Sequence, residues 1–149
     1  MLLPAFQLFF SVIEMRIGAF GDLVFEVSEQ KILTFDKWQR TTKHRYQKHD
    51  ILNHKPKLES VGSELEEISL EIYFSHFLNV SVKAEMAKLR QMCDDAAANF
   101  LIIGGEVVGN CLFVIEEISE GAEVWGGSGQ ILSSRVKVKF KEYEKIGDF

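Results

Sequence analysis

The clearest pattern in the chain is an alternation of apolar and polar side chains from Leu65 to Phe74. A period of two places successive residues on opposite faces of a β-strand, so this segment predicts a strand with one dry and one wet face. The predicted dry face carries Ile68, Leu70, Ile72 and Phe74, and the predicted wet face carries Glu67, Ser69, Glu71 and Tyr73.

Shorter apolar runs predict further strands on both sides of this one. Pro56 predicts a bend or bulge before it, and the pair Gly104–Gly105 predicts a tight turn after it. A second glycine cluster beside Trp125 predicts a loop. The segments expected to form strands are Leu23–Val27, Ile32–Gln39, Phe100–Ile103, Val107–Ser119 and a closing strand with Val136, Val138 and Phe140.

A different spacing follows Ser81. Apolar residues recur there at intervals of three and four, which predicts an amphipathic helix with Ser81 as its N-cap. The expected buried stripe is Val82, Met86, Leu89, Met92 and Cys93, and the expected wet face is Lys83, Lys88, Gln91, Asp94 and Asp95.

Strands on both sides of a single helix predict an α+β fold, in which a β-sandwich or barrel carries one packed α-helix. With 149 residues the chain fits one domain that buries a core without disulfides or metal. We assign this domain to residues 15–149. Its cysteines, Cys93 and Cys111, fit two buried thiols in a reducing compartment better than a disulfide framework.

Residues 1–14 differ from the remainder of the chain. They are apolar, with three phenylalanines and no charge before Glu14. The run has neither the basic start nor the small-residue cleavage site of a secretory signal, and it is too short to span a membrane. We interpret it as an extension produced by an upstream, non-native start codon. The alternative is a short helix that covers a hydrophobic patch.

Candidate chemical motifs do not converge on a site. His44, His49 and His54 are five residues apart, a spacing that points neighbours to different sides of either a strand or a helix. Ser128 lies in a glycine cluster that misses the nucleophile-elbow pattern by one position. The Gly104–Gly105 pair lacks the Lys-Ser/Thr and the helix of a phosphate loop. We therefore expect no catalytic, metal-binding or cofactor-binding residues, and no enzyme.

The distribution of charge is uneven. Residues 31–57 contain eight Lys or Arg and two Asp, a net charge of +6, whereas residues 59–123 carry a net charge of -10. One interpretation is a solvated basic hairpin. The other is an arm that lies on the acidic face of the next subunit, a head-to-tail contact able to close a ring. The expected arm residues are Arg40, Lys43, Arg45, Tyr46 and Lys48, in the far part of a projecting β-hairpin.

Several segments form a further pattern when they are taken together. They are residues 17–27 (IGAFGDLVFEV), 34–36 (TFD), 55–59 (KPKLE), Gly62, 65–70 (LEEISL), 88–90 (KLR), 101–105 (LIIGG) and 141–143 (KEY). In their order and spacing these segments resemble the GpU-like tail proteins of contractile-tailed bacteriophages. The chain departs from the family pattern at Asn53–His54, where glycines are expected, and at Ser63, where proline is expected.

This resemblance implies a fold like that of the phage tail tube and a structural role at the junction of tube and baseplate. The implied assembly is a ring-shaped, hexameric homo-oligomer in the virion tail, put together in the cytoplasm of the bacterial host. It would contact the tail tube protein and baseplate hub proteins, and help to initiate or complete the tube. The overall charge of -5 argues against nucleic acid as a direct partner. The alternative function is a monomeric binding or adaptor module that uses the basic hairpin for recognition.

Overall fold

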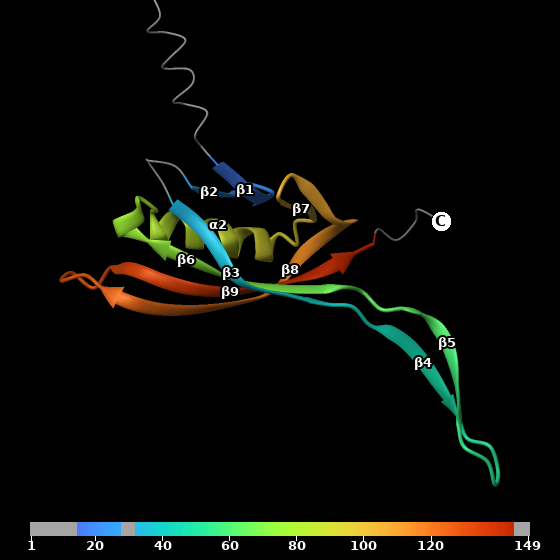
Figure 1. Cartoon of the computed structure of the whole chain (residues 1–149). Coiled ribbons are helices and arrows are strands. Elements are labelled where there is room, and N and C mark those ends of the chain that lie inside the picture. Colours follow the sequence, from blue (N-terminus) through green and yellow to red (C-terminus); the bar gives the residue numbers. More distant parts are fainter. Residues whose placement is uncertain (1–14, 28–31, 145–149) are drawn as a thin grey trace, which may run out of the picture.

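The body of the protein is a closed antiparallel barrel of seven strands (Figure 1). The computed structural model describes residues 15–27 and 32–144. Around the barrel the strands follow the order β1-β2-β3-β6-β9-β8-β7. They are β1 (Met15–Phe20), β2 (Leu23–Val27), β3 (Ile32–Thr41), β6 (Glu67–Ser75), β7 (Asn99–Ile103), β8 (Glu106–Trp125) and β9 (Ile131–Tyr143).

The expected α+β class and the β-sandwich alternative are wrong. Of the described residues, 64% are in strands and only 13% are helical, so the fold is mostly β. The barrel closes because β7 pairs with β1, where Gly18, Ala19 and Phe20 face Ile103, Ile102 and Leu101. The pairing joins the two ends of the strand order, so the seven strands form one closed sheet instead of the two packed sheets of a sandwich.

Because Gly18 has no side chain, the two strands can come close enough for the barrel to close. A Cβ atom on Gly18 would lie 2.5 Å from the backbone oxygen of Ile102 and 2.8 Å from Cδ1 of Ile103. Real Cβ atoms do not approach other atoms so closely, and backbone atoms of a paired strand cannot move aside cheaply. Glycine at position 18 therefore allows β7 to reach β1.

One α-helix packs against the barrel. It is α2 (Val82–Asp94), and it contacts chiefly β8 and β9. Its buried side chains include the four largest apolar residues of the predicted stripe, together with Glu85. Ser81 occupies the N-cap position, but its side chain makes no capping hydrogen bond. A short 3-10 helix, η2 (His76–Leu78), lies between β6 and α2.

The interior of the barrel is apolar and rich in phenylalanine. Phe20 of β1 meets Phe140 of β9 edge to face at 4.8 Å. The predicted alternation in β6 is confirmed, because its odd-numbered residues 67–73 are half-buried while Ile68, Leu70, Ile72 and Phe74 are buried. Val136, Val138 and Phe140 of β9 face the same core. Both cysteines are free and half-buried rather than fully buried.

A two-stranded sheet extends away from the barrel (Figure 1). It consists of β4 (His44–His49) and β5 (Lys57–Ser63), which continue the chain from β3 and back into β6. We call residues 42–66 the arm. Its tip is the segment 50–56, so the expectation that residues 40–49 form the far part is wrong: Arg40 and Thr41 still belong to β3. The apolar extension, residues 1–14, lies outside the described residues.

The close contact at Gly18 leads to a prediction. We expect Gly18→Ala to cost roughly 1–3 kcal/mol of folding free energy, because β7 must move away from β1. Thermal unfolding followed by circular dichroism measures the loss.

The matched control is Gly127→Ala, since nothing lies within 4 Å of a Cβ built at Gly127. It should unfold at nearly the wild-type temperature. If the two variants have equal melting temperatures, the barrel does not depend on the close approach of β1 and β7.

Candidate functional site

The base of the arm is held by a cluster of charged and polar groups. Arg40 Nη2 donates to both carboxylate oxygens of Glu66, at 2.6 and 2.9 Å. Thr42 Oγ1 donates to the same carboxylate at 3.3 Å. The backbone N–H of Glu66 in turn donates to Glu142 Oε2 at 3.0 Å, which connects the arm to the end of β9. Arg40 is therefore part of the junction between arm and barrel.

The structure places the other four predicted arm residues on different sides of the arm. Lys43 lies just before β4, where its carbonyl accepts a hydrogen bond from the N–H of Glu64. Tyr46 and Lys48 share one face of β4, because alternate residues of a strand point the same way. Arg45 points to the other face, and its guanidinium donates to the carbonyl of Val61 at 3.4 Å. The five residues therefore do not form one contiguous surface.

Pairing within the chain reduces the basic character of the segment. Lys37 lies in the barrel and binds Glu71 at 3.0 Å, and Lys48 binds Asp50 at 3.3 Å. Between residues 42 and 66 there are five Lys or Arg and four acids, Glu66 included. The cations that make no ion pair with a described residue there are Lys43, Arg45, Lys55 and Lys57. The arm is thus not strongly basic, although it has a few unpaired cations.

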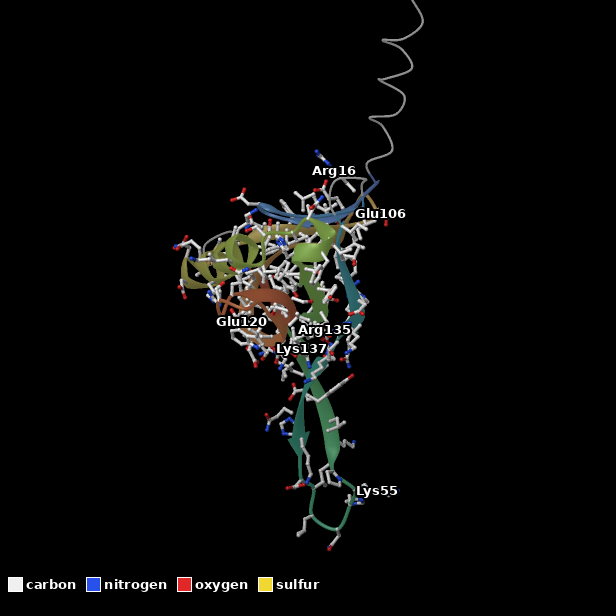
Figure 2. The ribbon with its side chains drawn as sticks, turned by 90° about the vertical axis from the view of Figure 1, so that its left-hand side faces the viewer. Arg16, Lys55, Glu106, Glu120, Arg135 and Lys137 are labelled. Carbon is white, nitrogen blue, oxygen red and sulfur yellow. The ribbon has the colours of Figure 1, made fainter. Side chains whose placement is uncertain are left out.

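The outer face of the sheet β3-β6-β9-β8 carries a network of ion pairs. Arg135 on β9 binds Glu123 of β8 at 2.6 Å and Glu71 of β6 at 3.4 Å. The hydrogen bond from Lys37 lowers the pKa of Glu71, and the bond to Glu123 raises the pKa of Arg135. Lys137 makes no ion pair within the described part of the chain. Figure 2 shows Arg135 and Lys137 on the side of the body toward which the arm extends.

Two strand edges of this sheet are open. β3 pairs with β2 only at Ile32 and Leu33, so its edge from Thr34 to Thr41 has no second strand among the described residues. β8 pairs with β7 no further than Phe113. The helix approaches β8 where Cys93 Sγ donates to the carbonyl of Ile115 at 3.6 Å. Residues 119–125 of β8 are all exposed. Both edges therefore offer backbone groups to a further strand.

The sequence was compared with known protein families and with curated proteins. A family model described as Phage P2 GpU matches residues 21–145. The chain belongs to the Phage P2 GpU family. Membership makes it a structural protein associated with the phage tail, and a component of the virion tail. No curated protein matches the chain.

Histidine and serine side chains, which are often catalytic or metal-binding in other proteins, each contact a different partner in this GpU-family chain. His44 contacts Ser60 Oγ at 2.6 Å, whereas His49 contacts Glu59 at 2.7 Å. Ser128 donates to Gln130 within an exposed turn. No cluster of metal-ligating side chains occurs in residues 15–27 and 32–144, and no helix there is long and apolar enough to cross a membrane.

A groove of about 530 Å³ lies between α2 and the far end of the β8–β9 hairpin. Its lining includes Val82, Met86 and Ile131 together with the ion pair of Arg90 and Glu120, whose closest atoms are 2.6 Å apart. That bond raises the pKa of Arg90. The groove thus combines apolar side chains with one ion pair.

Cys111, near the base of the arm, leads to a prediction about reactivity. Burial, with the nearby carboxylates of Glu142 and Glu66, raises the pKa of this thiol from 9.0 to about 11. The thiolate is the reactive form, and it appears only as the pH rises toward 11. In a Cys93→Ser variant at pH 8, we expect iodoacetamide to modify Cys111 at least about tenfold more slowly than in the urea-unfolded protein.

Rates measured by mass spectrometry at several pH values test this expectation. The native rate should keep rising above pH 9, where the rate of the unfolded protein levels off. Equal native and unfolded rates at pH 8 would contradict it.

Proposed function

We propose that the chain forms a hexameric ring at the junction of tail tube and baseplate, where it helps to initiate or complete the tube. In this proposal the sheet β3-β6-β9-β8 of each subunit joins those of its two neighbours. The partners along the tail axis are the tail tube protein and baseplate hub proteins. Assembly takes place in the host cytoplasm.

The observation that carries the proposal is the pair of open edges on opposite sides of one sheet. The four strands alternate in direction, so β8 of one subunit and β3 of the next run antiparallel when the sheets lie side by side. The antiparallel pattern thus continues across the contact. A contact between two different edges is heterologous, and it closes into a ring when the rotation between subunits permits.

Bulges restrict which edges can join. β3 is irregular between Asp36 and Gln39, where Lys37 has a φ of 51°, and β8 is irregular between Ala122 and Trp125. Bulges at an edge discourage indiscriminate pairing with other strands. A partner edge must therefore match these irregularities, which favours one defined neighbour over open aggregation.

The two ends of such a ring differ. Each arm leaves the sheet where β3 ends and β6 begins, whereas the loop between β8 and β9, which follows the exposed Trp125, lies at the opposite end (Figure 1). All subunits of a ring have the same orientation, so arms gather at one end and these loops at the other. A ring between tube and baseplate needs two unlike ends.

A monomeric adaptor that binds through the arm is the second candidate. Every residue of β4 is exposed, and a two-stranded ribbon is rarely stable without cover. This favours an arm that meets some partner, whether or not it is another copy of the chain. Molar mass in solution separates the two candidates, since the adaptor stays at 17.0 kDa.

The test combines light scattering with hydrogen exchange. At low salt we expect the mass of a hexamer, and slowed exchange of backbone amides in residues 34–41 and 119–125 relative to the monomer. Residues 67–73 lie between β3 and β9 in the monomer and should exchange slowly in both states. A hexamer without added protection at the two edges would exclude edge pairing, and a monomer at all concentrations would favour the adaptor.

Charge reversal tests the contribution of the arm. We expect Lys43→Glu with Arg45→Glu to lower the yield of rings at low salt, because electrostatic steering by the arm reverses sign. The matched control is Arg16→Glu with Lys83→Glu, which changes the net charge equally on β1 and α2. If both pairs reduce ring formation equally, only the total charge matters.

A further inference from the structure

An apolar row crosses the outer wall of the barrel near the end from which the arm leaves. Phe100 of β7 pairs with Leu112 of β8, and Leu112 pairs with Tyr143 of β9. Paired residues point to the same face of a sheet. Because their neighbours Leu101 and Phe113 are buried in the core, the row points outward. Phe100 is 49% exposed and Tyr143 is 44% exposed, so about half of each residue is open to a partner.

The arm has one apolar face that is also uncovered. Leu58 lies opposite Lys48, and Tyr46 lies opposite Ser60, so all four share one face. The exposed fractions are 57% for Tyr46 and 67% for Leu58, and the ring centroid of His44 lies 4.9 Å from that of Tyr46. The opposite face carries the polar residues Arg45, Gln47, His49, Lys57 and Glu59. A ribbon with one bare apolar face requires a partner surface to be stable.

The proposed ring brings these two surfaces together. The open edge of β8 ends at Phe113, because β7 occupies the edge beyond it. A neighbouring β3 that follows this edge continues into its arm, and the arm cannot go on pairing there. The arm bends toward the outer face of the sheet, the side that carries Arg135 and Lys137 (Figures 1 and 2). Leu112 and Tyr143 lie on that outer face, directly past the end of the open edge.

We propose that Tyr46 and Leu58 of one subunit pack on the row of Phe100, Leu112 and Tyr143 of the next subunit. The inference rests on the proposed ring and specifies the surface that its arms cover. Lys141, the cation that shares the outer face of β9 with Tyr143, is already paired with Glu67 at 3.6 Å and Glu116 at 3.9 Å, so it presents little free charge to an approaching arm. The bound ribbon gains the apolar cover that it lacks in the single subunit.

Cysteine cross-linking tests the contact in the full-length chain. Cys93→Ser and Cys111→Ser remove the native thiols, and Tyr46→Cys with Tyr143→Cys place one thiol on each surface. A short bismaleimide should then join chains head to tail into a ladder that ends at the closed ring. Either substitution alone leaves one thiol per chain and can link no more than two chains. If neither single variant forms a cross-linked dimer, a ladder in the double variant requires contact between the two surfaces.

The matched control pairs Tyr46→Cys with Phe77→Cys. Phe77 is 70% exposed and lies on η2, at the opposite end of β6 from the arm, so no ladder should form. Light scattering before cross-linking shows whether rings are present. Rings that yield no ladder with the Tyr46 and Tyr143 thiols would overturn the contact while the ring stands. Rings that yield equal ladders with Phe77 would overturn it too, and an absence of rings in the wild-type chain would overturn both proposals.

Discussion

The unbroken pairing of β6 with β9 sets the geometry of the whole molecule. Nine consecutive residue pairs join these strands, from Glu67 with Lys141 to Ser75 with Ser133, without a bulge. On one face this ladder brings together buried residues such as Leu70 and Val138, and on the other it aligns acids of β6 with cations of β9. A slip by one residue would exchange the two faces. The buried core on one face and the network of ion pairs on the other therefore both stabilise the same pairing register. The two flanking ladders, β3 with β6 and β8 with β9, contain bulges.

The sequence predicted those elements whose pattern is local. Alternation identified β6 and β9, and spacings of three and four identified α2, because their buried faces repeat with the period of the strand or helix. Closure of the barrel escaped prediction, since it depends on a pairing between residues about 85 positions apart and on the space that Gly18 leaves free. The order of elements alone fits both a barrel and a sandwich. The first strand, β1, carried no pattern strong enough to be assigned.

The site was predicted less well than the fold, for an electrostatic reason. A count of charges along the chain treats Lys37 and Arg40 as free, although both bind acids on β6 or just before it. These pairs are partly exposed, so each contributes little to stability, but they remove the cations from long-range attraction. What remains are unpaired cations near both ends of the arm, including Lys43 and Lys55. The sequence alone does not distinguish these unpaired cations from the paired ones, because the pairing depends on the fold.

The even number of strands in the sheet β3-β6-β9-β8 limits how this architecture can change over evolutionary time. In the proposed ring, addition or loss of a single edge strand would make the two edges run in the same direction where neighbouring copies meet, and the hydrogen bonds there would have to take the parallel pattern. An inserted hairpin would keep the number of strands even and preserve the proposed antiparallel contact. Relatives that widen or narrow the channel of a ring without changing the number of copies would therefore do so by whole hairpins.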